Sequence, residues 1–174
     1  LSSMVSDLID LSRIEYGDLK LNIKDLNFNE FMDSFLVSMK SVAKKRSIAL
    51  NFNPKHTGLM YADSQALERV MNNLCDNAYK YSEAGSSVEI STRDQGKMIK
   101  VMVSDSGEGV PSEDKEYIFD RFFRTASARA SDNKGSGLGL AIVKNLINSL
   151  NGEVGITSNK PKGSIFWFTI PKSK

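Results

Sequence analysis

Three polar side chains lie at helical spacing within residues 64–81, and their types suit a metal ion and a phosphate group. Apolar residues recur there at three- and four-residue intervals, which predicts a helix with one broad apolar face. Asn73, Asn77 and Lys80 lie together along one border of that face. Two carboxamide oxygens one turn apart are hard ligands that suit Mg²⁺, and an ammonium group one turn further can meet phosphate oxygens. The spacing predicts a polar stripe facing a cleft, with a solvated helix face as the alternative.

A second candidate group is an aspartate followed by two glycines. Period-two alternation from Met98 predicts a strand that places Asp105 on the apolar side with Val103. A buried carboxylate is costly without hydrogen-bond donors, and the exocyclic amine of a bound base is one candidate donor. Gly107 and Gly109 permit a sharp turn and the close approach of a flat ligand. A strand-end turn with a solvated aspartate is the alternative.

A third candidate is the glycine-rich segment that opens a helix expected over about residues 138–150. It consists of Gly135, Ser136, Gly137, Leu138 and Gly139. Free backbone N–H groups and the positive end of the helix dipole make such a segment suited to phosphate. A polar loop precedes the glycines where a dinucleotide-binding fold needs a strand, and the Gly-Lys-Ser or Gly-Lys-Thr of a Walker loop is missing from the sequence.

The elements that must position these groups alternate between short strands and helices. This order predicts an α+β domain, a mixed sheet with helices on one face. Strands are expected at 19–23, 48–52, 59–62, 88–92, 98–105, 153–157 and 164–170, and a helix capped by Asn29 at about 29–46. That helix is expected to bury Phe31, Phe35, Met39 and Val42. Residues 106–136, rich in charge and glycine, are expected to form a mobile loop.

The composition is that of one soluble globular domain. The chain has 174 residues, 40% of them apolar and 25% charged, with a net charge of +2. This charge is too small to indicate nucleic-acid binding, and no apolar run approaches the roughly 18 residues that span a bilayer. One cysteine and one histidine, His56, exclude an internal disulfide and a multi-histidine metal site.

Residues 1–17 predict an amphipathic helix that Gly17 ends. Its apolar stripe starts at residue 1 with no capping turn before it, so we expect the chain to begin inside a longer helix. The stripe either packs on the chain's own core or pairs with a second helix in a bundle or dimer. Its members are Leu1, Met4, Val5, Leu8, Ile9 and Leu11.

Taken in order, five segments resemble the ATP-binding boxes of bacterial sensor histidine kinases. They are Asn73–Ser82, Asp105–Gly109, Ile118–Arg124, Gly135–Ile142 and Gly163–Phe166. Leu8–Gly17 also resembles the end of the family's second dimerisation helix, which favours the helical-hairpin dimer for the apolar stripe. The resemblance implies a two-layer α/β sandwich of the Bergerat type, as in gyrase, Hsp90 and MutL, over residues 18–174, preceded by the truncated dimerisation helix at 1–17.

The resemblance also implies a role for each candidate residue. Asn77, with Asn73 beside it, holds Mg²⁺ on the ATP phosphates, and Lys80 contacts phosphate. Tyr81 lies near the adenine and Asp105 binds its amino group. The glycines at 107 and 109 shape the base pocket. The segment 135–139 brings backbone N–H donors to the phosphates.

The phenylalanine-rich box is implied to order a lid over the nucleotide. Arg121 and Arg124 are the residues that hold this lid, which covers about residues 125–134. Phe119, Phe122 and Phe123 either pack under the lid or contact the ligand directly.

The family transfers the γ-phosphoryl group of ATP to a histidine on its dimerisation helices, from which a response-regulator aspartate takes it. The resemblance implies the same activity here, in the cytoplasm, whether or not the parent kinase is anchored in a membrane. The implied partners are the phosphoacceptor domain of the parent kinase, a response regulator and a second copy in a homodimer. A nucleotide-binding or dimerisation module without catalysis is the alternative.

The chain departs from the family pattern in three places. The acceptor histidine is expected upstream of Leu1, because His56 lies in a loop between Pro54 and Gly58 without the acid that follows an acceptor, and is interpreted as a surface histidine. Asn73 stands where hydrolytic relatives carry a glutamate, so fast ATP hydrolysis is not expected. Only Gly163 is present where many relatives have two glycines.

Overall fold

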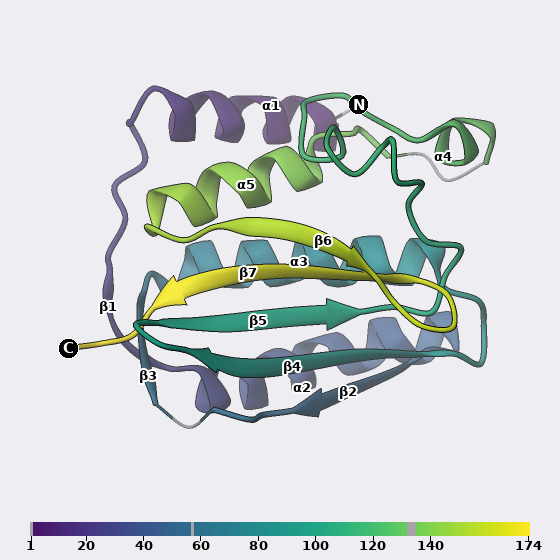
Figure 1. The fold of residues 1–174 in the computed structure, drawn as a ribbon. Coiled ribbons are helices and arrows are strands. Elements are labelled where there is room, and N and C mark those ends of the chain that lie inside the picture. The colour runs from purple at the N-terminus through teal and green to yellow at the C-terminus, as the bar shows by residue number, and fades with distance from the viewer. Residues whose placement is uncertain (1, 57, 132–134) are drawn as a thin grey trace.

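A five-stranded mixed sheet is the centre of the fold (Figure 1). The computed structural model describes residues 2–56, 58–131 and 135–174. The strand order is β2-β4-β5-β7-β6, in which only β2 and β4 run parallel. The strands span Ala49–Asn53 (β2), Ser87–Gln95 (β4), Met98–Ser104 (β5), Val154–Ser158 (β6) and Ser164–Pro171 (β7).

Three helices cover one face of this sheet: α2 (Phe28–Arg46), α3 (Ser64–Tyr81) and α5 (Gly139–Ser149) (Figure 1). The apolar residues on that face of β5, such as Val101 and Val103, are fully buried, whereas Lys100 and Met102 on the other face are not covered by a helix. This arrangement confirms the predicted mixed sheet with helices on one face.

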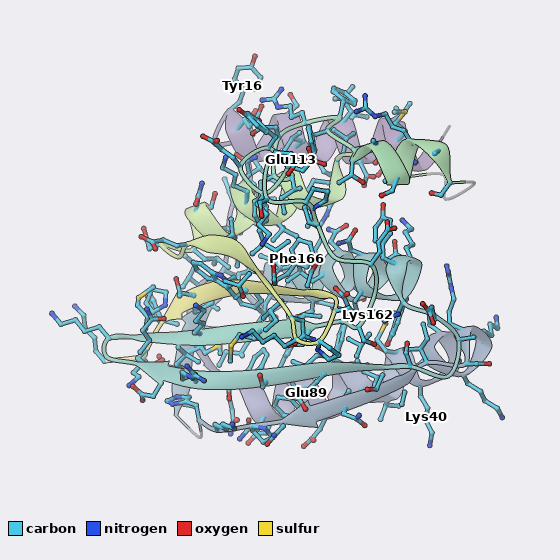
Figure 2. All side chains as sticks on the ribbon, turned by 45° about the vertical axis from the view of Figure 1, so that its right-hand side comes forward. Tyr16, Lys40, Glu89, Glu113, Lys162 and Phe166 are labelled. Carbon is cyan, nitrogen blue, oxygen red and sulfur yellow. The ribbon has the colours of Figure 1, made fainter. Side chains whose placement is uncertain are left out.

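The N-terminal helix α1 (Ser2–Glu15) lies outside this layer and packs on α5 (Figure 1). Leu11 and Ile14 are buried, whereas Met4, Val5, Leu8 and Ile9 are each at least 40% exposed. Packing on the chain's own core therefore holds for Leu11, whereas pairing with a second helix stays a prediction for the four exposed residues; Leu1 lies outside the described residues. Tyr16, just after α1, points away from the molecule (Figure 2).

The strand predicted at the start of the domain is wrong. No strand forms at 19–23; the strand is β1 (Lys24–Asn27), which pairs antiparallel with β3 (Leu59–Ala62). Leu21 and Ile23 nevertheless pack against the core, which accounts for the apolar alternation there.

The cap of α2 is Asn27 and not Asn29. The Asn27 backbone is extended, and its side-chain oxygen accepts the N–H groups of Asn29 and Glu30. Phe35 and Met39 are buried as predicted, and Phe31 is partly buried against the core. Val42 is 38% exposed, because the turn of the helix presents Ala43 to the core instead.

The described part of the segment predicted as a loop contains a short helix, α4 (Ala126–Ala130). Thr125 caps it by accepting the N–H of Ala128, and the Ser127 hydroxyl donates to Glu108 at 2.8 Å. Among the described residues, no helix is both long and apolar enough to cross a membrane.

Candidate functional site

A cavity of about 200 Å³ lies where α3, the turn after β5 and the start of α5 meet. Most of the predicted site residues line it: Asn73, Asn77, Lys80, Tyr81, Asp105, Gly109, Arg124, Gly135, Ser136, Gly137 and Gly139. Gly107, Arg121 and Leu138 are not among the described residues that line the cavity. The structure thus brings together groups that are up to 66 positions apart in the sequence.

Helix α3 positions the two asparagines. Asp63 caps the helix by accepting the Ala66 N–H at 2.9 Å, and the apolar face that the asparagines border is buried through Leu67, Val70, Met71 and Leu74. With that face fixed against the core, the border of the helix must face the cavity.

The side-chain amide of Asn73 is oriented by its neighbours. Its Nδ2 donates to the backbone oxygen of Arg69 at 3.0 Å, so Oδ1 is the atom that remains to accept or to coordinate. A Cβ atom added to Gly139 would lie 3.1 Å from this Oδ1, so the Asn73 oxygen faces the start of α5. One turn further along α3 than Asn73 and Asn77, Lys80 forms an ion pair with Asp76 at 2.8 Å.

Asp105 is only 4% exposed and is held at one edge of its carboxylate. Oδ1 accepts the backbone N–H groups of Gly107, at 2.9 Å, and Ser164, at 3.2 Å. Burial raises the pKa of Asp105 above its ordinary value, and these two backbone hydrogen bonds oppose the shift without cancelling it. Within the described part of the chain, Oδ2 accepts no hydrogen bond, so this edge is available to a donor on a ligand.

In the part of the chain that the structure describes, Gly107 does not line the cavity, but it packs against two residues that do. A Cβ atom there would lie 2.2 Å from the backbone oxygen of Tyr81, so only glycine lets this turn pack against the end of α3. Gly107 thereby places Tyr81 and Asp105 on the same side of the cavity.

The glycine-rich segment packs against the phenylalanine-rich segment. Gly137 has φ +73°, and a Cβ atom on it would lie 2.8 Å from the Cα atom of Phe122. Phe122 N donates to Gly137 O at 2.9 Å. The Leu138 side chain is fully buried and anchors the segment in the core, while its N–H donates to the Ser136 hydroxyl at 3.2 Å.

The two arginines predicted to order a lid lie in different places. Arg124 lines the cavity and donates to the backbone oxygen of Ala128, which ties it to α4. Arg121 forms an ion pair with Glu15 at the end of α1. Of the proposed lid, residues 132–134 lie outside the described residues.

The three phenylalanines of the same segment differ in environment. Phe119 is buried edge-on against Phe166, with ring centroids 6.4 Å apart, whereas Phe123 lines the cavity. Phe122 is 54% exposed. The packing interpretation therefore holds for Phe119 and in part for Phe123, which packs against the core and also borders the cavity, so ligand contact by Phe123 stays a prediction.

His56, interpreted from the sequence as a surface histidine, is mostly covered by its neighbours. Its side chain is 11% exposed, with Nδ1 3.4 Å from the Asp94 carboxylate, and its Nε2 accepts the N–H of Gly58 at 2.9 Å. Among the described residues, His56 and its two partners do not line the cavity.

Some residues near the site were not predicted from the sequence, and two of them come from distant segments. Asp7 of α1 lines the cavity and lies 3.5 Å from the Arg69 guanidinium, an arrangement that depends on the docking of α1. Asn159 donates to the backbone oxygen of Asp105 at 2.7 Å, across 54 positions of sequence. Neither residue belongs to a periodic pattern, so no local signal could have identified them.

Comparison with known proteins identifies the family. Residues 62–174 match the family described as "Histidine kinase-, DNA gyrase B-, and HSP90-like ATPase". The chain belongs to this family. Within it, the order of the boxes and the relatives make this chain the ATPase domain of a two-component sensor histidine kinase.

The relatives include sensor kinases from several bacteria. The chain is 34% identical over 171 residues to "Sensor-like histidine kinase SenX3" of Mycobacterium tuberculosis (strain ATCC 25618 / H37Rv), covering 98% of the chain and 42% of that protein. It is 31% identical to "Sensor histidine kinase WalK" of Bacillus subtilis (strain 168), covering 97% of the chain and 28% of that protein. The chain therefore spans less than half the length of these relatives.

Solved structures of histidine kinases share the fold of this ATPase domain. The full-length kinase ShkA, crystallised in complex with AMPPNP, has a TM-score of 0.86 at 26% identity, over 99% of this chain and 36% of that one. The Acinetobacter baumannii histidine kinase AdeS has a TM-score of 0.80 at 28% identity, over 99% of this chain and 79% of that one.

Proposed function

We propose that this domain binds Mg-ATP in the cavity between α3 and α5 and transfers the γ-phosphoryl group to a histidine of its parent's dimerisation helices. The observation that carries the proposal is the buried Asp105, whose Oδ1 is occupied by two backbone donors and whose Oδ2 is left for a ligand at the cavity. A buried carboxylate oxygen that is left to accept a hydrogen bond fits the amino group of adenine as its donor. The AMPPNP complex of the related kinase ShkA supports the same class of ligand.

The metal-binding assignment rests on the donor types in α3. Asn73 has its amide nitrogen committed to Arg69 O, which leaves its oxygen toward the start of α5, and Asn77 lines the same wall one turn later. Neutral carboxamide oxygens suit Mg²⁺ that keeps several waters and is shared with substrate phosphates. The two residues therefore fit the ion, which when bound supplies charge neutralisation for the phosphates.

The phosphate end of the ligand is assigned to Lys80 and to the segment that opens α5. Lys80 brings an ammonium group to the cavity, and its ion pair with Asp76 holds the side chain in position. The start of α5 supplies backbone N–H groups and the positive end of a helix of eleven residues. Arg124, tied to α4, adds a second cation to the same cavity.

The chain's own residues bind and orient ATP, and the nucleophile comes from elsewhere. The resemblance places the acceptor histidine on the dimerisation helices, so transfer requires docking of that domain at the cavity. Asn73 offers an amide where hydrolytic relatives have a glutamate, and an amide cannot accept a proton from water. We therefore expect the bound γ-phosphoryl group to be retained for the histidine and not lost rapidly to water.

We further infer a cytoplasmic domain that acts in a homodimer and whose product is read by a response regulator. Support comes from the family and from relatives named as sensor histidine kinases. The four exposed apolar residues of α1 are the surface we assign to helix pairing within the dimer.

Label transfer tests the proposal directly. The chain is mixed with its full-length parent carrying Asn77→Ala, and label from γ-³²P-ATP is followed on the parent. Transfer in the presence of the wild-type chain, and its loss when the chain also carries Asn77→Ala, is the expected result. Tight ATP binding and demonstrated docking without any label would instead favour the non-catalytic module.

A further inference from the structure

We propose that Asn159, in the turn between β6 and β7, is a positioning residue for Asp105 and sets how strongly the site prefers adenine. The proposal rests on the proposed function, because it concerns the carboxylate assigned to the adenine amino group. Asn159 does not line the cavity itself among the described residues. It lies instead in a groove on the uncovered face of the sheet, and Asp105 is the residue that borders both spaces.

The side-chain amide of Asn159 is held at both ends. Its Nδ2 donates to the backbone oxygen of Asp105 at 2.7 Å, and its Oδ1 accepts the N–H of Lys160 at 2.9 Å. Its backbone N–H donates to Gly163 O at 2.9 Å, which closes the turn on itself. The donor group therefore has one orientation, and that orientation points at the strand end that carries the carboxylate.

The same turn holds Asp105 through its backbone. Asp105 N donates to Ser164 O at 2.9 Å, and Ser164 N donates back to Asp105 Oδ1 at 3.2 Å. Gly163 has φ +109°, and a Cβ atom there would lie 2.1 Å from Asp105 O, so the two backbones are in direct contact. Among these contacts, the one from Asn159 is the only one to which the turn contributes a side chain.

Fixing the carbonyl of Asp105 fixes the peptide plane that leads into the turn at Gly107. That turn supplies the N–H that holds Oδ1, so the direction of Oδ2 depends on the carbonyl being held. A hydrogen bond to the ligand's base weakens steeply when its angle is poor. Loss of the Asn159 donor should therefore act on recognition of the base and not on the phosphate end of the site.

The test compares ATP with inosine triphosphate, which has a carbonyl oxygen in place of the adenine amino group. Binding of each Mg-nucleotide to the whole chain is measured by isothermal titration calorimetry for wild type, Asn159→Ala and Asn159→Asp. The aspartate variant keeps the shape and the acceptor for Lys160 N–H but carries no donor for Asp105 O. Both variants should lose about three- to tenfold in ATP affinity with inosine triphosphate unchanged, as for one hydrogen bond.

Lys162→Ala is the matched control, because Lys162 lies in the same turn (Figure 2) and pairs with Glu83 at the surface. It should leave the ratio of the two affinities unchanged. An equal loss for both nucleotides in the Asn159 variants, or no loss for either, would overturn the positioning role.

Asp105→Asn separates this inference from the proposed function. If Asp105→Asn leaves the ratio of the two affinities at its wild-type value, the assignment of the base to Asp105 is wrong. If Asp105→Asn abolishes the preference for ATP and the Asn159 variants retain it, only the role of Asn159 is overturned.

Discussion

Substitution of Asp105 by asparagine keeps the oxygen that accepts the backbone N–H groups and replaces the oxygen that faces the ligand with an NH₂ group. The asparagine Oδ1 can still accept the N–H groups of Gly107 and Ser164, so the turn keeps its two hydrogen bonds. The other edge becomes an NH₂ group, which meets the adenine amino group donor to donor. The variant therefore loses a hydrogen bond to a charged acceptor, a loss of about 1.5–3 kcal/mol.

That loss corresponds to an ATP affinity about 10- to 150-fold lower, because each 1.4 kcal/mol is about tenfold. Calorimetric titration with Mg-ATP measures it. Asp105→Ala serves as the comparison, since it leaves the two buried N–H groups unpaired at about 1–3 kcal/mol each and should destabilise the fold as well. Binding of ATP by Asp105→Asn at wild-type affinity would refute the assignment of the base.

The stability of Asp105→Asn has a defined dependence on pH. Burial raises the folded-state pKa of Asp105, so the folded state binds a proton that the unfolded state has already released. Wild-type stability therefore falls as pH rises from the ordinary pKa of aspartate through the raised folded-state pKa. Asparagine does not titrate, so the variant should gain on wild type over this window and keep the gain at higher pH. Thermal unfolding of both proteins between pH 3 and pH 8 measures this. A variant that loses stability relative to wild type as pH rises contradicts the reasoning.

Four further predictions follow from single contacts. Gly137→Ala places a Cβ atom against Phe122 at φ +73°, and should cost about 1–3 kcal/mol in unfolding free energy and weaken ATP binding, measured by denaturant titration and calorimetry. Leu11→Ala truncates a side chain that is 1% exposed and leaves a cavity, so it should lower the unfolding free energy by about 2–5 kcal/mol. Leu8→Ala, on the exposed side of α1, should change the unfolding free energy by no more than about 0.5 kcal/mol. Arg69→Ala removes the ion pairs to Asp7 and Asp10, and should speed amide hydrogen exchange in α1 by up to about fivefold without changing exchange in β5. Lys172→Met removes the hydrogen bond that holds the pKa of Asp94 below its ordinary value, so that pKa should rise toward normal in an NMR titration, and an unchanged value would contradict the assignment.

The sequence predicted the elements whose periodicity is strong. Helix α3 has one apolar face over eighteen residues, and its predicted bounds agree with the structure, as do those of β3. The position of Asn73 and Asn77 on the border of that face followed from the same pattern, because helical geometry fixes both sets of side chains together. The burial of Asp105 followed from the period of the strand in the same way.

Elements with weak or competing signals were misplaced. β1 has four residues, only one of them buried, while the apolar alternation lies just before it. Asn27 and Asn29 are equally good caps by type, and the extended backbone that selects Asn27 depends on the pairing of β1 with β3. The contacts of Arg121 with α1 and of Asn159 with Asp105 join distant segments, so no local pattern could specify them.

The central claim, that nucleotide binds between α3 and α5, is tested most directly by glycine-selective ¹⁵N labelling. The chain has 12 glycines, and Gly109, Gly135, Gly137 and Gly139 line the cavity. On addition of Mg-ATP, the amide signals of these four should shift in a saturable manner, whereas Gly17 and Gly96, at the end of α1 and in the β4–β5 turn, should not. Saturable binding that leaves the four cavity signals in place would contradict the account.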